Sequence, residues 1–226
     1  MTDLEPKSII KIKGNENVAE NQSEFLHLNQ NEKLKEPRNP LLCDYVIEGR
    51  LGKGSFGEVF KATLRTSSSP KDSSVALKKI PKNNPNFNRR CLKREIQAGT
   101  RLHHQGIVKF KTFFETENSF YLVYELLRGM DLYSLLKSRG SFPLKEMEVK
   151  YLAKQLIEAL VYCHSQETCH RDIKLENIFL TESGTVKLID FGLSAHISPE
   201  DECHDFVGSS YFAAPEVVAR RPYSGS

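Results

Sequence analysis

The chain has 226 residues, which is enough for one substantial domain or for a small domain with a tail. Hydrophobic residues make up 39% and charged residues 27%, as is usual for a globular protein. A net charge of +3, from 32 basic and 29 acidic residues, gives no electrostatic case for binding nucleic acid.

No apolar run approaches the ~18 residues that a membrane span needs, and the N-terminus lacks a charged-then-apolar secretory signal. We therefore expect an intracellular protein without a membrane partner, in the cytoplasm, the nucleus or both. The cysteines are odd in number, and their spacing matches neither a zinc site nor a disulfide framework. We interpret them as free thiols in a reducing compartment: Cys43, Cys91, Cys163, Cys169 and Cys203.

Residues 1–43 are rich in Asn, Glu, Lys and Gln and have no sustained apolar period. Such a segment buries too little surface to offset the entropy of ordering, so we expect a disordered N-terminal tail. Its short apolar patch at 25–28 is either a docking element or an incidental cluster, and the incidental reading is favoured.

From Tyr45 the pattern changes to short apolar segments typical of strands, with a polar insert at 66–74. Residues 88–102 have helical spacing, which Gly99 weakens. The strands predicted in this half are 45–47, 58–62, 75–80, 107–114 and 120–124.

The second half is predicted to be mainly helical, with helices at 131–137 and 145–165 and short strands at 178–180 and 186–189. The longer helix carries apolar residues at intervals of three and four, which form one face. These residues are Val149, Leu152, Ala153, Leu156, Ile157, Leu160 and Val161.

A glycine-rich segment, GKGSFGEV at 52–59, lies between two predicted strands. Glycines let the backbone approach a polyphosphate closely and point its N–H groups at it. A dinucleotide-binding fold would need a helix directly after the last glycine, whereas Glu58 and Val59 continue as a strand. The segment alone is a weak signal.

Lys78 lies on the next predicted strand among apolar neighbours. A lysine that points inward needs an anionic partner, because burying an unpaired ammonium is costly. Glu95 on the following helix can supply that partner while Lys78 reaches phosphates. Taken alone, Lys78 would be a solvated strand lysine; the neighbouring motifs favour a functional role.

The stretch His170–Asn177, HRDIKLEN, is the most specific in the chain. Asp172 can orient a hydroxyl and accept its proton, Lys174 can neutralise phosphoryl charge, and Asn177 offers an oxygen to a metal ion. Asp190 follows in the sequence DFG and adds a second hard oxygen ligand suited to magnesium.

With these motifs in order, and Ala214-Pro215-Glu216 after them, residues 45–226 resemble the eukaryotic protein kinase family. The resemblance implies an α+β fold of two lobes, with a strand-rich N-lobe that is complete and a helical C-lobe that is incomplete. It implies a kinase domain at 44–226, divided into an N-lobe at 44–124, a hinge at 125–131 and a partial C-lobe from 132.

By the same resemblance, ATP and Mg²⁺ are the expected cofactors, and Tyr124 is the gatekeeper beside the adenine site. The expected catalytic residues are Lys78, Glu95, Asp172, Lys174 and Asn177, and the expected metal ligands are Asn177 and Asp190. The expected nucleotide-binding residues are Leu51, Gly52, Lys53, Gly54, Ser55, Phe56, Gly57, Val59, Ala76, Lys78, Glu125, Leu127, Asp131, Phe179 and Asp190.

The chain resembles the serine/threonine branch at two positions: Lys174, two residues after Asp172, and Ser209, just after Gly208. Its overall sequence pattern resembles calcium/calmodulin-dependent and AMP-activated kinase relatives. Protein substrates with serine or threonine are therefore implied. Asp131 and Glu176 match positions where basophilic kinases hold substrate arginines, so we expect basic residues N-terminal to the target. The oligomeric state is not indicated.

Three features depart from the family pattern. Asp205 stands where an activating threonine is usual, and is either a fixed partner of Arg171 that partly replaces phosphate or a solvated loop acid. Gly99 stands where a leucine or methionine is usual, leaving a gap that Phe110 or Phe113 could fill. The chain also ends soon after Glu216, before the remaining helices, so we expect an exposed apolar face on the 145–165 helix.

Three functions remain open at this point. The leading hypothesis is an ATP-dependent serine/threonine protein kinase, because Lys78, Asp172, Asn177 and Asp190 are all present. The missing helices favour instead a catalytically impaired nucleotide-binding or interaction module. A small-molecule kinase or GTPase is disfavoured by the lysine-bearing strand and by Ala214-Pro215-Glu216.

Overall fold

The computed structural model describes residues 41–54, 57–65, 73–198 and 202–224. Several predictions from the sequence lie outside these ranges. They concern most of the N-terminal tail, the nucleotide-binding roles of Ser55 and Phe56, and most of the polar insert.

The first half of the described chain is an antiparallel sheet of five strands in the order β1-β2-β3-β5-β4. Its core is built by side chains that alternate along the strands, as the period of two in a strand requires; Val75 and Leu77 on β3 are buried, for example. The strands are β1 Tyr45–Lys53, β2 Glu58–Leu64, β3 Ser74–Pro81, β4 Phe110–Glu115 and β5 Ser119–Glu125.

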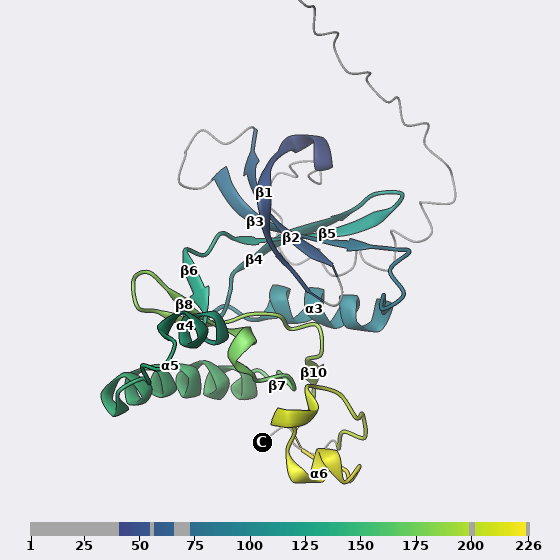
Figure 1. The fold of residues 1–226 in the computed structure, drawn as a ribbon. Coiled ribbons are helices and arrows are strands. Elements are labelled where there is room, and N and C mark those ends of the chain that lie inside the picture. Colours follow the sequence, from purple (N-terminus) through teal and green to yellow (C-terminus); the bar gives the residue numbers. More distant parts are fainter. Residues whose placement is uncertain (1–40, 55–56, 66–72, 199–201, 225–226) are drawn as a thin grey trace, which may run out of the picture. The chain divides into compact units, whose positions relative to one another are not determined.

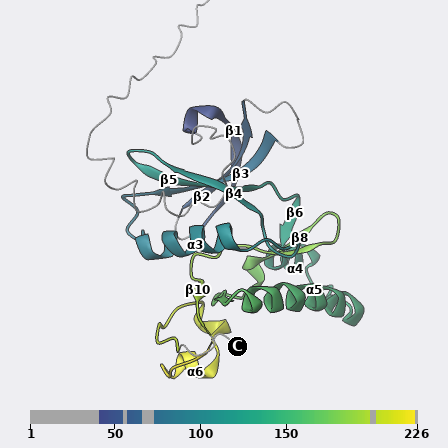
Figure 2. The same ribbon diagram turned by 180° about the vertical axis from the view of Figure 1, so that it is seen from behind.

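Helix α3, Arg89–Arg101, lies alongside this sheet in both views of the fold (Figures 1 and 2). It begins at Asn88, whose side chain accepts hydrogen bonds from two backbone N–H groups of the first turn, as a good N-cap does. Its buried face carries Leu92, Ile96 and the acidic Glu95. A buried carboxylate on an otherwise apolar face requires a partner and indicates function.

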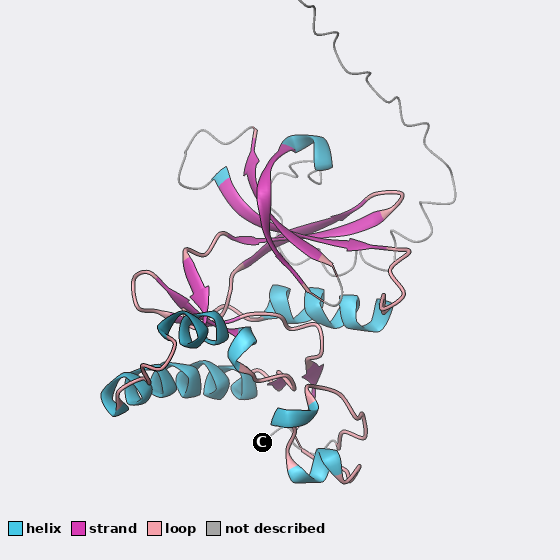
Figure 3. Cartoon of the chain, viewed as in Figure 1, coloured by secondary structure: helices cyan, strands magenta, loops and turns pink. Residues whose placement is uncertain are grey.

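The second half is mainly helical, with short strands between the helices (Figure 3). The principal helices are α4 Leu132–Arg139 and α5 Glu146–Ser165, followed by the short α6 Pro215–Val218. The strands are β6 Gly129–Asp131, β7 Thr168–Cys169, β8 Ile178–Thr181, β9 Val186–Leu188 and β10 Ala195–His196. The 3-10 turns are η3 Leu42–Asp44, η4 Leu175–Asn177 and η5 Ser210–Phe212.

One apolar core joins α3 to this second half. It contains Ala98 from α3, Leu102 just after α3, Ala159 from α5, Leu188 from β9, and Phe191. Helix α3 packs against both the sheet and the second half of the chain. The position of Glu95 is therefore tied to the segment that carries Asp190. The prediction of an α+β fold with a strand-rich first half is confirmed.

Several element boundaries differ from those predicted: β1 runs on to Lys53 rather than ending at residue 47, and two further differences lie nearer the site. The strand predicted at 107–114 begins only at Phe110, because Ile107 forms a parallel bridge with Leu188 of β9 and the N–H of Val108 donates to the same residue. The predicted hinge at 125–131 is also partly regular, since Glu125 ends β5 and residues 129–131 form β6.

The apolar face predicted for α5 is divided. Leu152 is buried and Leu156 packs against the core, whereas Val149, Ile157 and Val161 are exposed. The expected exposed apolar surface on this helix is therefore present. Among the helices in the described ranges, none combines the length and apolar character needed to cross a membrane.

Candidate active site

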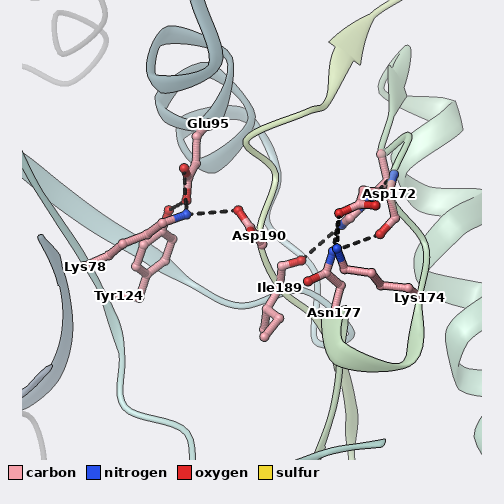
Figure 4. A network of polar contacts seen from close by, with 9 residues as sticks. Lys78, Glu95, Tyr124, Asp172, Lys174, Asn177, Ile189 and Asp190 are labelled. Carbon is pink, nitrogen blue, oxygen red and sulfur yellow. Dashed lines mark hydrogen bonds and ion pairs between the residues drawn. The ribbon is translucent and has the colours of Figure 1, made fainter. Parts of the chain in front are cut away.

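Lys78 occupies the centre of the site and contacts two carboxylates. Its Nζ lies 2.7 Å from Glu95 Oε1 and 2.9 Å from Asp190 Oδ1 (Figure 4). Burial of the ammonium works against its charge, but the carboxylates of Asp190 and Glu95 hold the pKa of Lys78 above its usual value. Lys78 therefore stays protonated, and the predicted pairing with Glu95 is confirmed.

Glu95 is only 4% exposed and is bound from two directions. Both carboxylate oxygens accept from Lys78, and Oε1 also accepts from the Tyr124 hydroxyl at 2.6 Å. Burial raises the pKa of Glu95, and these donors oppose that effect. The Tyr124 phenol has a pKa raised well above its usual value by burial and by the Glu95 carboxylate, so it remains a donor.

Asp190 approaches Lys78 from the segment after β9. Its backbone has φ of 62°, a left-handed conformation that is uncommon for a residue with a side chain and often marks functional sites. The ammonium of Lys78 holds the pKa of Asp190 below its usual value. The residue is therefore an anion at neutral pH, available as a hard oxygen ligand.

Asp172 lies at the centre of a second polar group. Its Oδ2 accepts from Asn177 Nδ2 at 2.9 Å and lies 2.8 Å from Lys174 Nζ, while its Oδ1 accepts from the Ser209 hydroxyl at 2.8 Å. Burial works against the carboxylate, but hydrogen bonds from Lys174 and Ser209 hold the pKa of Asp172 below its usual value. A carboxylate in this state can accept a hydroxyl proton once a substrate replaces Ser209.

His170 connects the two polar groups through the backbone. Its ring is 1% exposed, lies 3.1 Å from the carbonyl oxygen of Ile189, and accepts from the N–H of Asp172. The backbone N–H of Ile189 donates in turn to the Asn177 carbonyl. These contacts fix the loop that carries Asp172 against the segment that carries Asp190.

Asp205 lies between two arginines from different elements. Its Oδ2 is 2.9 Å from Arg94 Nη2 on α3 and 3.3 Å from Arg171 Nη1. The hydrogen bond from Arg94 is the main reason that the pKa of Asp205 is lowered. The predicted contact with Arg171 is confirmed, so Asp205 is not simply a solvated acid; the contact with Arg94 was not predicted.

The glycine-rich segment has one position that only glycine can occupy. A Cβ on Gly57 would lie 2.0 Å from the carbonyl oxygen of Lys79, and the Gly57 carbonyl accepts from the N–H of Gly54 at 2.8 Å. Gly52 and Lys53 belong to β1, opposite Val59 and Glu58. The turn is therefore closed by backbone hydrogen bonding, as expected for a loop that covers phosphates.

Strand register pairs some of the residues predicted to hold adenine and ribose, in two different sheets. Ala76 pairs with Tyr124 across β3 and β5, and Asp131 pairs with Phe179 across β6 and β8. Leu51 is 54% exposed. Val59, Leu127 and Phe179 are partly exposed.

Two predicted nucleotide contacts have additional partners. The Glu125 side chain accepts from Lys187 Nζ at 2.7 Å and from the N–H of Lys109 at 2.8 Å, and the Glu125 backbone N–H donates to the Lys109 carbonyl at 2.9 Å. The Asp131 carboxylate caps α4 by accepting from the N–H and the hydroxyl of Ser134. Both contacts hold the connection between the two halves in place.

The donor set fits a magnesium ion shared with phosphates. Both hydrogen bonds of the Asn177 amide nitrogen go to Asp172, and no hydrogen bond in the described ranges uses the amide oxygen. Within those ranges there is also no group of three or more His, Cys, Asp or Glu side chains that could hold a metal alone. Mg²⁺ usually takes one or two protein oxygens and completes its shell with phosphates and water, so Asn177 and Asp190 suffice.

Two contacts that shape the site were not predicted from the sequence: Arg94 to Asp205 and Tyr124 to Glu95. Arg94 directly precedes Glu95, and a basic residue beside a functional acid on an amphipathic helix is a signal too common to be specific. The Tyr124 contact depends on sheet register, which periodicity does not reveal.

Lysine and glutamate from the sheet half thus face two aspartates and an asparagine from the helical half, an arrangement typical of enzymes that transfer phosphoryl groups. The model of the protein kinase domain family matches residues 45–226. The chain therefore belongs to the protein kinase domain family, as its motifs predicted.

Several characterised relatives agree. Sperm motility kinase 2B of Mus musculus is 36% identical over 187 residues, which cover 81% of this chain and 36% of that protein. CBL-interacting serine/threonine-protein kinase 1 of Arabidopsis thaliana is 36% identical over 203 residues, covering 87% and 44%. NUAK family SNF1-like kinase 1 of Homo sapiens is 34% identical over 183 residues, covering 80% and 27%. The chain spans less than half the length of these relatives.

Proposed function

We propose that this chain is the catalytic part of an ATP-dependent protein kinase that phosphorylates serine and threonine. The observation that carries the proposal is Lys78, bound at once to Glu95 on α3 and to Asp190 beyond β9. Those residues lie far apart in the sequence, and a buried ammonium held between two carboxylates is suited to binding phosphate oxygens.

Binding of ATP would use the two halves together. Lys78 would bind phosphate oxygens while Glu95 holds its ammonium, and the backbone of the glycine-rich turn would cover them. Asn177 and Asp190 would hold Mg²⁺, which neutralises charge on the phosphate oxygens. The carbonyl oxygen of Glu125 and the backbone of Leu127 would bind adenine.

Asp172 would act on the substrate hydroxyl. The hydroxyl oxygen forms a bond to the γ-phosphorus as the bond from that phosphorus to the β–γ bridging oxygen breaks, so ADP leaves. The hydroxyl proton passes to Asp172, whose lowered pKa keeps it an anion before the transfer. Lys174, 2.8 Å from Asp172 Oδ2, neutralises charge on the phosphoryl group.

Two observations support serine and threonine as targets. Lys174 and Ser209 contact each other at 3.0 Å and both contact Asp172, so the residues that resemble this branch act on the same carboxylate. Relatives named as serine/threonine-protein kinases are also among those matched. Asp131 and the exposed Glu176 would favour basic residues N-terminal to the target. An array of serine peptides with and without arginines tests this preference.

A second candidate is a nucleotide-binding module that transfers no phosphoryl group. It is favoured by Ser209, whose N–H and hydroxyl both donate to Asp172 Oδ1 and so occupy the proton acceptor. The two candidates agree on nucleotide binding and differ on transfer.

One set of variants separates them. Magnesium-dependent ATP binding is measured by calorimetry, and transfer by phosphate incorporation into arginine-containing serine peptides. Asp190→Asn should abolish magnesium-dependent binding, whereas Asp172→Asn should retain binding and lower transfer by about 10²-fold or more. Glu158→Gln is the matched control, because it also removes one carboxylate but lies on the exposed side of α5. Binding without transfer by the wild type would support the module, and no magnesium-dependent binding would refute both.

A further inference from the structure

The Glu95 carboxylate has a partner that family motifs do not supply. Tyr124 donates its hydroxyl hydrogen to Oε1 at 2.6 Å, the same oxygen that lies 2.7 Å from Lys78 Nζ (Figure 4). A carboxylate that is 4% exposed needs all of its hydrogen bonds, because an unsatisfied buried anion is costly. Tyr124 therefore contributes directly to the stability of the Lys78–Glu95 pair.

Sheet register explains how Tyr124 reaches Glu95. Lys78 pairs with Leu122, and Ala76 pairs with Tyr124. Since side chains two residues apart on a strand share a face, Tyr124 lies diagonally from Lys78 on the face that meets α3. The lysine and the tyrosine thus approach one carboxylate from neighbouring strands.

Phe110 and Gly99 support the Tyr124 ring. Phe110 pairs with Tyr124 across β4 and β5, and the two rings meet edge to face with centroids 5.5 Å apart. On the other side Phe110 lies against α3, where a Cβ on Gly99 would be 2.7 Å from Phe110 Cγ. Gly99 is one turn after Glu95, so both residues lie on the same face of the helix. The gap expected at Gly99 is filled by Phe110 rather than by Phe113.

We propose that Tyr124 is a positioning residue for the phosphoryl transfer: its hydroxyl fixes the Glu95 carboxylate in the orientation that holds Lys78, and Phe110 packed on Gly99 holds the tyrosine. The proposal rests on the proposed kinase function. Lys78 also contacts Asp190 at 2.9 Å, so two carboxylates compete for one ammonium. The tyrosine hydroxyl keeps Glu95 in place during that competition.

Tyr124→Phe tests the proposal by removing one oxygen and keeping the ring. We expect kcat/KM for ATP to fall at least about tenfold, the lower end of the effect of losing one hydrogen bond to a charged group. Tyr121→Phe is the matched control: it removes the same atom from the same strand, but Tyr121 faces the opposite side and stacks on Phe114. It should leave kcat/KM unchanged.

A second readout does not depend on activity. Modification of Lys78 by a small amine-acylating reagent, followed by mass spectrometry, should be about tenfold faster in Tyr124→Phe than in the wild type and unchanged in Tyr121→Phe. In a Glu95→Gln background, Tyr124→Phe should add nothing to either measurement, because the group it positions is gone. A merely structural tyrosine would give additive effects.

The outcomes separate this inference from the proposed function. A wild type that protects Lys78 through Tyr124 but never binds magnesium and ATP supports the contact and refutes the kinase. If wild type and Tyr124→Phe transfer phosphate equally fast and their Lys78 residues are modified equally fast, the positioning role is overturned. If Tyr124→Phe does not fold, Phe110→Leu loosens the same ring and should also speed Lys78 modification; no increase would count against the proposal.

Discussion

Replacing Asp205 by asparagine removes the charge that joins α3 to the loop carrying Asp172. Asp205 Oδ2 lies 2.9 Å from Arg94 Nη2 and 3.3 Å from Arg171 Nη1. The Arg171 side chain is 2% exposed, so its guanidinium depends on partners within the protein. One of its nitrogens, Nη2, is already buried with no hydrogen-bond partner in the described part of the chain.

The unfolding free energy that Asp205→Asn should lose lies between two limits. Breaking a fully buried ion pair costs about 3–5 kcal/mol, whereas an exposed pair contributes about 0–1 kcal/mol. The Asp205 side chain is 40% exposed, and solvent screens its charge in proportion, so we expect Asp205→Asn to lower the unfolding free energy by about 2 kcal/mol. For a domain of this size that is a fall in Tm of roughly 4–8 °C.

Urea denaturation and thermal unfolding measure this loss, with Glu202→Gln as the control. Glu202 is an exposed acid in the same segment, and its replacement makes the same change in net charge. Phosphate transfer should also fall in Asp205→Asn, because Arg171 directly precedes Asp172. Equal stability of the two variants would show that Asp205 is only a solvated acid and would refute the reasoning.

The effect of pH gives an independent check. The folded-state pKa of Asp205 is lowered, mainly by Arg94. Its contribution is therefore complete above the unfolded pKa, about 3.9, and is lost as pH falls through the folded value. The difference between wild type and Asp205→Asn should be constant from pH 7 to about pH 5 and should shrink below about pH 4.

Two further predictions concern packing and a buried histidine. Gly99→Ala should destabilise the fold by about 1–3 kcal/mol despite the better helix propensity of alanine, because the new methyl meets Phe110; Gly49→Ala, with open space around it, is the control in thermal unfolding. Burial lowers the pKa of His170, so on acidification this histidine is protonated in the unfolded chain before it is protonated in the folded one. Stability should therefore fall as pH drops below about 6.5. Denaturant titrations from pH 8 to 5 should show that fall reduced in His170→Gln and retained in His164→Gln, where the histidine is exposed.

Much of the site could be predicted from residue type and order. The glycine turn, Lys78, Asp172 and Asp190 each lie in a short segment whose chemistry is local, so motif spacing was enough to propose their roles. The ends of α3 and α5 were also predicted to within one residue, because Asn88 and Lys145 begin long stretches of helical apolar spacing. These features depend on neighbours in the chain.

The sequence by itself therefore determined which chemical groups the protein has and which elements carry them. Only the tertiary structure decided that Phe110 rather than Phe113 fills the space at Gly99, that Tyr124 bonds Glu95, and that Arg94 shares Asp205 with Arg171. The physical reason is that these contacts join segments distant in sequence. Strand register and the packing of α3 set which side chains meet, and neither is expressed in local periodicity.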